Sequence, residues 1–279
     1  STPCGTLFPY TTLFRSIRTG GLGDFILTLP LLHALGRRGD EVTCITRIGY
    51  ARLAADDAPG VAFGDVDGPD FLSLNTTPTA RARQWFEQAE VLSFWPDHDG
   101  SLRLQLGALG ALGLTRLDPR PATPPHVVQH MLATAGLDPT ADLPRGAFLR
   151  RTATPAQDTL WLHPGSGSPA KNAPLQAFVD AVEDRRPEEV VLSFGPADND
   201  LIAPATAALG AWEPRCVINP SLTQLRRQLS TGATAYVGND SGVSHLAAAL
   251  GIRATVFFVH TNPAIWQPLG EAVAVLAPA

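Results

Sequence analysis

The hydrophobic residues of the C-terminal half fall into short apolar runs separated by amphipathic stretches. These runs predict strands at 159–163, 190–194, 216–219, 235–238 and 254–258. The stretches between them predict helices at 175–182, 199–209, 222–229 and 243–250. This alternation indicates parallel βαβ units in a doubly wound sheet, which binds its ligand at the carboxyl ends of its strands.

The N-terminal half shows the same alternation less clearly. Apolar residues from Phe25 to Leu35 recur at helical spacing, and Pro30 is expected either to kink this helix or to open a second one. A polar, proline-containing stretch at 150–158 predicts the linker between two domains, 17–150 and 151–279. Further runs predict strands at 42–46, 71–74 and 91–94 and helices at 102–112 and 126–135.

The first residues of the chain have a different character. Residues 6–16 read TLFPYTTLFRS, a string that one reading frame of a common sequencing adapter encodes. A signal peptide is disfavoured, because the segment lacks a charged start and a continuous apolar run before a small-residue cleavage site. We therefore expect residues 1–16 to be an assembly artefact, and the genuine sequence to begin near Ile17 with the start of its first strand lost.

Composition narrows the class of protein. The 279 residues are 44% apolar and 17% charged, which is enough apolar material for a sizeable core. The net charge of −5 argues against a nucleic-acid partner bound through bulk electrostatics. Cys4, Cys44 and Cys216 show no CxxC spacing, and no apolar run is long enough to span a bilayer. We expect a reducing, cytoplasmic setting without a disulfide framework or a zinc site.

The strongest chemical motif is VGNDSGVSH, residues 237–245. A helix that begins inside it directs free N–H groups and the positive end of its dipole at any anion there. Gly242 permits close approach of a ligand, Ser241 adds a hydroxyl, and His245 lies one turn into the helix. The alternative is a plain N-cap by Asp240 or Ser241, with His245 at the surface. In combination with the other motifs, the segment favours a phosphate site.

A second motif, LHPGSGSPAK, spans residues 162–171 and is expected to form the loop after the first strand of the C-terminal domain. Its glycines and its serines, Ser166 and Ser168, can wrap a polar group. Lys171 supplies a positive charge suited to a departing diphosphate. The spacing excludes a Walker A loop. The alternative interpretation is a flexible loop with a solvated lysine.

A third motif, TGGLGD, spans residues 19–24 and lies between the first strand and its helix. Gly20, Gly21 and Gly23 permit a tight turn and close approach of a ligand, although the pattern is not GxGxxG. Asp24 is expected to face the cleft between the domains, where a carboxylate can accept the proton of an attacking hydroxyl. An N-cap aspartate is the alternative.

Other polar residues receive no chemical assignment from the sequence. Trp266 is the one tryptophan for which we consider a place in the cleft. The histidines form no metal-ligand cluster, and we expect no metal site. Most of a basic set is expected to be solvated rather than to meet an acidic acceptor: Arg18, Arg37, Arg38, Arg47 and Arg52.

The three motifs, in this order, resemble those of the ADP-heptose:lipopolysaccharide heptosyltransferases, glycosyltransferase family nine. The matching stretches are residues 18–35, 162–171 and 237–251, and residues 256–270 resemble the segment that follows. The resemblance implies a GT-B fold, in which two Rossmann-like domains face each other across a cleft. The N-terminal domain would hold the acceptor, and the C-terminal domain would hold the nucleotide sugar.

The same resemblance implies an inverting, metal-independent transfer of a heptose or related sugar, with ADP-heptose as the donor and no further cofactor. Asp24 matches the position of the base, and Lys171 matches the lysine that contacts the donor phosphates. The acceptor would be a lipopolysaccharide core or another surface glycan, reached at the inner face of the cytoplasmic membrane. The remaining donor-side matches are Ser166, Ser168, Asp240, Ser241, Gly242 and His245.

The sequence also departs from the family pattern. Asn172 stands where a tryptophan commonly follows the lysine. Ala197 stands where an acidic residue is expected to hold the ribose, and Asp198 comes one position later. The usual C-terminal helices are not found, so we also expect the chain to be a fragment.

The alternatives are therefore a degenerate nucleotide-binding module, a glycosyltransferase with a different nucleotide sugar, and a dinucleotide-dependent oxidoreductase. The last is disfavoured by the missing GxGxxG. The glycine turn also resembles that of glycogen and starch synthases, whose chains are much longer.

Overall fold

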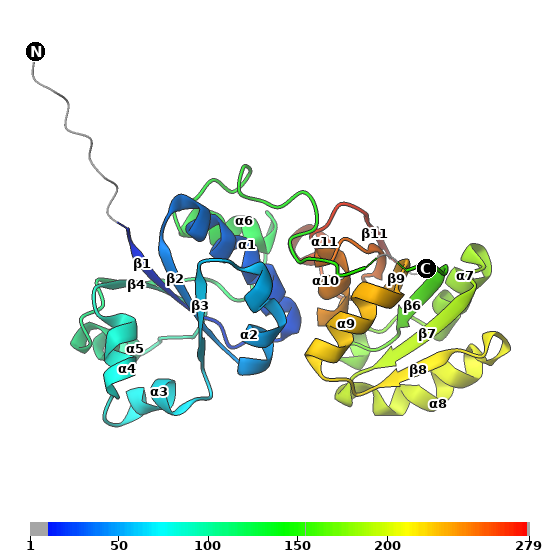
Figure 1. Cartoon of the computed structure of the whole chain (residues 1–279), viewed down its shortest axis with the longest axis horizontal. Helices are drawn as coiled ribbons and strands as arrows, with labels where there is room; N and C mark the ends of the chain where they lie inside the picture. Colours follow the sequence, from blue (N-terminus) through cyan, green and yellow to red (C-terminus); the bar gives the residue numbers. More distant parts are fainter. Residues whose placement is uncertain (1–10, 154, 278–279) are drawn as a thin grey trace, which may run out of the picture.

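The computed structural model describes residues 11–153 and 155–277, which form two parallel sheets with helices on both faces (Figure 1). Cys4 and residues 6–10 of the adapter-like string lie outside these residues. The N-terminal sheet has the order β3-β2-β1-β4-β5. Its strands are β1 (Leu13–Ile17), β2 (Glu41–Thr46), β3 (Val61–Asp65), β4 (Ala89–Ser93) and β5 (Gly113–Arg116). Its helices are α1 (Leu22–Arg38), α2 (Ile48–Ala54), α3 (Pro69–Leu72), α4 (Ala80–Phe86), α5 (Ser101–Ala108) and α6 (Val127–Thr134).

The C-terminal sheet has the order β11-β10-β9-β6-β7-β8. Its strands are β6 (Thr159–His163), β7 (Glu189–Phe194), β8 (Arg215–Ile218), β9 (Ala235–Asn239), β10 (Arg253–Phe257) and β11 (Val273–Leu276). Its helices are α7 (Leu175–Arg185), α8 (Asn199–Ala208), α9 (Leu222–Gly232), α10 (Gly242–Ala249) and α11 (Pro263–Trp266). In both sheets the strand order reverses beside the first strand, β1 or β6, and such a switch point opens a crevice at the carboxyl ends of the strands.

The expected α/β architecture is confirmed, and the elements expected in the C-terminal half are all present. The strand expected at 71–74 is wrong. Pro69 opens the short helix α3 directly after Gly68, because proline suits the first helical position, and a 3-10 turn follows. Elements without a clear apolar period were missed: β3, β5, β11, α2, α4 and α11.

Helix α1 is a single helix of 17 residues with Pro30 inside it. Almost every residue from Phe25 to Leu35 is buried, so the helix is packed on several sides. Burial of this many apolar side chains outweighs the roughly 3 kcal/mol that an interior proline costs. The helix therefore continues past Pro30 and carries its N-terminus to the switch point of the first sheet.

Strand β1 begins at Leu13, so residues 13–16, which we left out of the expected fold, form most of the first strand. Leu13 to Ile17 pair in parallel with β2 on one side and β4 on the other. Pairing uses main-chain groups, which any non-proline sequence supplies. The interior position of Arg15 is unusual for such a strand. Its guanidinium bonds the main-chain oxygen of Trp85 and the carboxylate of Glu41.

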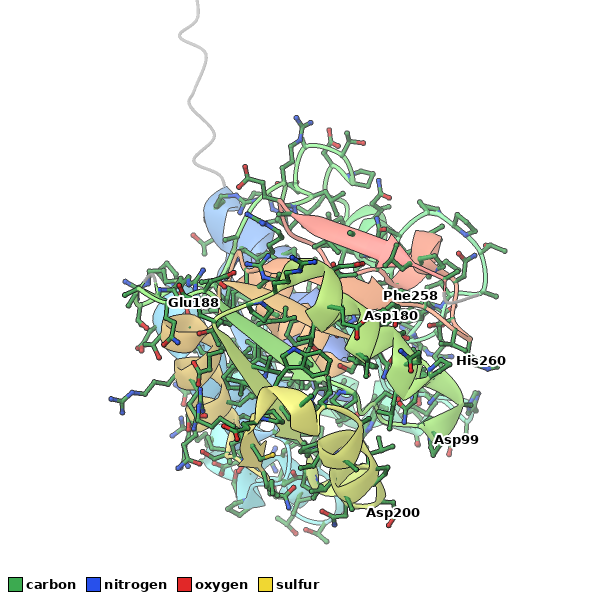
Figure 2. The ribbon with its side chains drawn as sticks, turned by 90° about the vertical axis from the view of Figure 1, so that its right-hand side faces the viewer. Asp99, Asp180, Glu188, Asp200, Phe258 and His260 are labelled. Carbon is green, nitrogen blue, oxygen red and sulfur yellow. The ribbon has the colours of Figure 1, made fainter. Side chains whose placement is uncertain are left out.

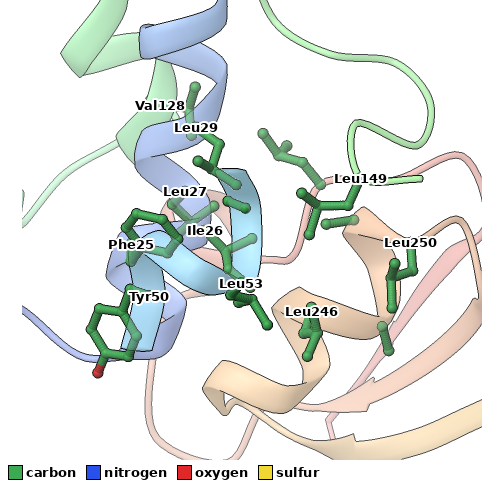
Figure 3. Close-up of a cluster of buried hydrophobic side chains, with 14 of the residues drawn as sticks. Phe25, Ile26, Leu27, Leu29, Tyr50, Leu53, Val128, Leu149, Leu246 and Leu250 are labelled. Atoms are coloured by element: carbon green, nitrogen blue, oxygen red, sulfur yellow. The ribbon is translucent and has the colours of Figure 1, made fainter. Parts of the chain in front are cut away.

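One hydrophobic core continues from the N-terminal half into the C-terminal half (Figure 3). Phe25, Ile26 and Leu29 of α1 belong to the same buried cluster as Leu246 and Leu250 of α10. Polar contacts join the halves nearby: His126 Nε2 lies 2.8 Å from the carbonyl oxygen of Gln267. The two sheets are therefore joined by packed side chains along one side.

Charged side chains lie on the outer surface of the C-terminal half. Figure 2 shows Asp180, Glu188 and Asp200 at its periphery, whereas Phe258 is buried. Within residues 11–153 and 155–277, we find no helix that combines the length and hydropathy needed to cross a bilayer.

Candidate active site

A cavity of about 1130 Å³ lies where the carboxyl ends of the two sheets meet. The loops after β1, β4 and β5 form one wall, and those after β6, β9 and β10 form the other. We call this cavity the cleft. Most residues singled out from the sequence line it: Gly20, Gly21, Gly23, Asp24, Ser168, Lys171, Asp240, Ser241, Gly242 and His245. Ser166 lines a smaller adjoining pocket of about 210 Å³.

Asp24 is the third residue of α1 and folds back over the glycine turn. Its Oδ2 accepts the N–H of Gly21 at 2.8 Å, and its Oδ1 accepts an N–H of Arg18 at 2.8 Å. A Cβ on Gly20 would lie 2.4 Å from Oδ2. Gly20 therefore makes room for the carboxylate of Asp24, where the sequence suggested room for a ligand. The N-cap of α1 is Gly21 and not Asp24, but the Asp24 carboxylate accepts the N–H of that N-cap residue and, at 34% exposure, still faces the cleft.

Arg18 is not solvated as expected. It is 2% exposed, and its guanidinium carbon lies 3.9 Å from the centre of the Phe94 ring. Burial lowers the pKa of Arg18, and the neighbouring Asp24 opposes that shift. An apolar ring on one side and a carboxylate at the tip fix this cation in the N-terminal wall.

Asp240 is the centre of the opposite wall. Its Oδ2 accepts hydrogen bonds from Lys171 Nζ at 2.7 Å and Thr261 Oγ1 at 2.6 Å, and its Oδ1 lies 3.9 Å from His245 Nε2. Burial alone would raise the pKa of Asp240. The contacts with His245, Lys171 and Thr261 outweigh it and hold the pKa well below the usual range. Lys171 is 30% exposed, so its ammonium group still reaches the cleft.

Ser241 caps helix α10, as the alternative interpretation of its motif proposed. Its Oγ accepts the N–H of Ser244 at 3.4 Å, and Ser244 Oγ in turn donates to the carbonyl oxygen of Asn239 at 2.5 Å. Tyr236 joins this network at 2.9 Å from Ser244 Oγ, and burial raises its pKa. The hydroxyl of Ser241 is therefore largely used within the protein. The other main-chain N–H groups in the first turn of α10 are not needed for hydrogen bonds within the helix.

The N-termini of α1 and α10 touch each other across the cleft. A Cβ on Gly242 would lie 2.7 Å from the Cβ of Leu22 and 2.9 Å from the main-chain N of Gly23. A Cβ on Gly23 would lie 2.9 Å from the ring of His245. Gly23 and Gly242 therefore allow α1 and α10 to meet, whereas the sequence suggested that they make room for a ligand. Both helices consequently direct the positive ends of their dipoles into one cavity.

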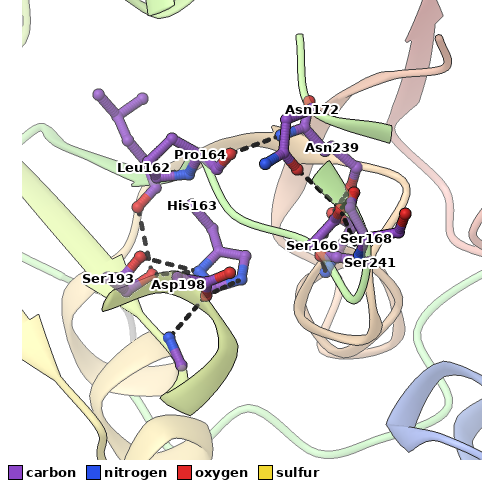
Figure 4. A network of polar contacts seen from close by, with 12 residues as sticks. Leu162, His163, Pro164, Ser166, Ser168, Asn172, Ser193, Asp198, Asn239 and Ser241 are labelled. Atoms are coloured by element: carbon purple, nitrogen blue, oxygen red, sulfur yellow. Dashed lines mark hydrogen bonds and ion pairs between the residues drawn. The ribbon is translucent and has the colours of Figure 1, made fainter. Parts of the chain in front are cut away.

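The loop after β6 is held by internal hydrogen bonds (Figure 4). Ser166 Oγ lies 2.6 Å from the carbonyl oxygen of Ser168 and 2.7 Å from Oδ1 of Asn172. The side chain of Asn239 donates to the carbonyl oxygen of Pro164 at 2.7 Å and accepts the N–H of Ala173 at 2.9 Å. These hydrogen bonds support the conformation of the loop in which Lys171 Nζ bonds Asp240.

A buried His163–Asp198 pair, which the sequence did not identify, lies beneath this loop (Figure 4). The Nε2 of His163 is 3.8 Å from Oδ2 of Asp198, and its Nδ1 is 2.9 Å from the carbonyl oxygen of Ser193. Burial lowers the pKa of His163. Asp198 also accepts the N–H of Gly195 at 2.7 Å, and its carboxylate fills the space that a side chain on Gly165 would need. The pair couples the two loops that line the smaller pocket.

The N-terminal wall also carries cations that the sequence did not single out. Arg116 and Arg120 line the cleft, together with His98. Trp266 lies in the cleft, as we considered from the sequence. In the described ranges no group of three or more His, Cys, Asp and Glu side chains is placed to hold a metal ion. Of the described cysteines, Cys44 is buried, Cys216 is exposed and both are free.

Comparison with known proteins gives a family match and several solved relatives of the same fold. Residues 140–277 match the model of glycosyltransferase family 9 (heptosyltransferase). No curated protein matches the chain.

Three solved structures are similar over most of the chain. A glycosyl transferase family 9 protein from Veillonella parvula has a TM-score of 0.72 at 18% identity, over 95% of this chain and 86% of its own. The E. coli heptosyltransferase WaaC with ADP has a TM-score of 0.67 at 16% identity, over 95% and 92%. The E. coli ADP-heptose lps heptosyltransferase II has a TM-score of 0.65 at 19% identity, over 94% and 89%.

At these identities the structures show the fold, which is the GT-B arrangement of two Rossmann-like domains. The family match covers the half that contains Lys171 and the 237–245 motif. The family match over residues 140–277 and the shared fold support a heptosyltransferase-like glycosyltransferase of family 9.

Proposed function

We propose that the chain transfers a heptose or a related sugar from ADP-heptose to a lipopolysaccharide-core or other surface-glycan acceptor, with inversion at the anomeric carbon. One observation carries this proposal: Asp24 shares a single cavity with Lys171, Asp240 and His245 from the other half. The ADP bound in the E. coli WaaC structure supports an adenine nucleotide as the leaving group.

In this reaction the oxygen of an acceptor hydroxyl attacks the anomeric carbon, and Asp24 takes the hydroxyl proton. The bond between that carbon and the diphosphate oxygen breaks, and ADP leaves with the bonding electrons. Negative charge grows on the diphosphate, so positive groups nearby lower the barrier. We assign this role to Lys171 and to the N-terminus of α10, without a metal ion or further cofactor.

The remaining donor-side residues then divide by what their side chains contact. Ser168 and His245 line the cleft, which supports a role for both in binding the donor. Ser166 and Ser241 use their hydroxyls to hold the loop and the helix, so we expect them to act through the main chain they position.

The acceptor side has a positive wall. Arg116 and Arg120 line the cleft on the side of Asp24, which suits an acceptor that carries acidic groups. A glycolipid acceptor would place the enzyme in the cytoplasm, peripheral to the inner face of the membrane.

Calorimetric titration of the full chain with ADP, GDP, UDP and NAD tests the proposal, in wild type and in Lys171→Ala. We expect ADP to bind most tightly and the variant to bind it at least about tenfold more weakly, since a charged hydrogen bond to phosphate is lost. ADP-heptose turnover would then be assayed. Preference for UDP or GDP would change the donor. Absence of binding in a folded protein would favour a degenerate module instead.

A further inference from the structure

Arg18 is a buried cation whose side-chain hydrogen bonds both go to one residue. One guanidinium N–H reaches Oδ1 of Asp24 at 2.8 Å, and the Nε–H reaches the carbonyl oxygen of Asp24 at 3.3 Å. With 2% of its surface exposed, the guanidinium itself has little access to a substrate in the cleft. Its influence on chemistry there must pass through Asp24.

Burial of an arginine is costly unless its charge is compensated, because the ion loses its hydration. A donor that only held the turn together would not need a charge, because the neutral main-chain N–H of Gly21 already bonds Oδ2 of Asp24. The stack on Phe94 at 3.9 Å fixes the plane of the guanidinium, and with it the direction of the hydrogen bond to Oδ1.

We propose that Arg18 is a positioning residue for transfer: it fixes the rotation of the Asp24 carboxylate so that unused lone pairs face the acceptor hydroxyl. This rests on the proposed function of Asp24 as the base. Three contacts restrain the carboxylate. Arg18 bonds Oδ1, the N–H of Gly21 bonds Oδ2, and the carboxylate packs against Gly20 in the space that a side chain there would occupy. Each carboxylate oxygen has more than one lone pair, so both can be bonded and still accept a proton.

Loss of Arg18 removes one of these points, and the carboxylate can then rotate about the remaining bond to Gly21. Displacement of a catalytic group by about 1 Å costs on the order of 100-fold in rate. A positioning role therefore predicts a loss in kcat with little change in donor KM. A purely structural role predicts a loss of folded protein with unchanged kcat per folded molecule.

The test is a double-mutant cycle in the full chain. Arg18→Met keeps an apolar stem without the charge, Arg18→Lys keeps the charge, and Asp24→Asn removes the base while retaining its size. We expect Arg18→Met to lower kcat by about 100-fold with donor KM within about threefold, and Arg18→Lys to recover at least about tenfold. In the Asp24→Asn background, Arg18→Met should cost less than about twofold, because its effect passes through Asp24.

Arg15→Met is the matched control, since Arg15 is also a buried arginine, within β1, but it bonds Trp85 and Glu41 instead. We expect its kcat to stay within about twofold of wild type, as for a change away from the site. Equal losses in both arginine variants, or losses in the cycle that simply multiply, would overturn the positioning role. So would a large rise in donor KM for Arg18→Met, which would indicate direct contact with the donor.

Melting temperatures of the same variants separate failure of this inference from failure of the proposed function. If wild type binds no nucleotide and shows no transfer, the proposed function fails. The coupling between Arg18 and Asp24 is then tested by the melting temperatures alone. Non-additive shifts for Arg18→Met and Asp24→Asn would retain the coupling on which the inference depends, and additive shifts would overturn it.

Discussion

The two walls of the cleft each hold a carboxylate paired with a cation, but the two cations differ in freedom. Arg18 pairs with Asp24 at 2.8 Å and is 2% exposed, whereas Lys171 pairs with Asp240 at 2.7 Å and is 30% exposed. In the first pair the cation is fixed and the carboxylate is accessible. In the second pair the carboxylate is buried and the cation is accessible. The accessible partner is therefore a carboxylate on one wall and an ammonium group on the other.

This difference fits the two halves of a transfer reaction. A proton acceptor must be aimed before the substrate arrives, because its contribution depends on geometry. A group that follows a departing phosphate must move with the developing charge, and a lysine on a flexible stem does this better than an arginine.

Replacement of Asp24 by Ala should affect turnover most strongly. We expect kcat to fall by about 10²–10⁴, the usual contribution of a general base, while the Kd for ADP changes by less than about threefold. Steady-state kinetics and calorimetry measure the two effects. Asp142→Ala, which breaks the surface pair with Arg37, is the control and should leave both unchanged. Wild-type turnover in Asp24→Ala would refute the base assignment.

Replacement of Asp240 by Asn should destabilise the C-terminal wall by about 3 kcal/mol at pH 7, because it breaks a mostly buried ion pair. The folded pKa of Asp240 is below its unfolded value of roughly 3.9, so its stabilisation is present above that pH and is lost as the pH falls further. Melting temperatures between pH 3 and 7 measure this. Wild type should lose more of its stability on acidification than Asp240→Asn, and parallel curves would contradict the pairing.

Addition of a methyl group where α10 meets α1 should weaken the junction of the two halves. In Gly242→Ala the new Cβ would lie 2.7 Å from that of Leu22, and overpacking of this kind costs about 1–3 kcal/mol. Gly167→Ala is the matched control, because nothing lies within 4 Å of its Cβ position. Denaturant unfolding should separate the two variants. Equal stability would mean that the helices do not touch in solution.

Replacement of Arg15 by Val should have the smallest effect, and one of opposite sign. Thr43 and Val91 flank Arg15 on the neighbouring strands, and the partner Glu41 is largely exposed. A β-branched residue suits a central strand, and substitution of a buried charge by a packed apolar side chain is often stabilising, here by about 1 kcal/mol. Denaturant unfolding measures the change. A loss above about 2 kcal/mol would show that Arg15 is structurally required, unlike an ordinary strand residue.

The sequence predicted those parts of the fold that have a strong local signal. Periodicity located every strand from β6 to β10, and the motifs located the loops at the switch points. The short helix α3 was mistaken for a strand because a four-residue apolar run has no measurable period. Residues 13–16 were left out of the predicted first strand because of their suspected origin. Their main-chain groups nevertheless pair with β2.

The candidate site could be located from the sequence, but the partners of its side chains could not. Arg18 was expected at the surface because the ring that covers it belongs to Phe94, which follows a different strand, β4. Gly242 looked like a ligand contact because the helix it meets is more than two hundred residues away in the chain. His163 and Asp198 meet only when β6 and β7 lie side by side. Long-range contacts of this kind leave no periodic signal in a single sequence.

The core shared by α1 and α10 has a consequence for any attempt to build hybrids of this enzyme with its relatives. A new C-terminal half would bring its own α10, whose apolar face must fit against Phe25, Ile26 and Leu29. A junction placed at the linker would cut through this shared core even though it breaks no helix or strand. Functional chimeras should therefore carry α1 and α10 from the same parent, so that the two helices are inherited as one unit.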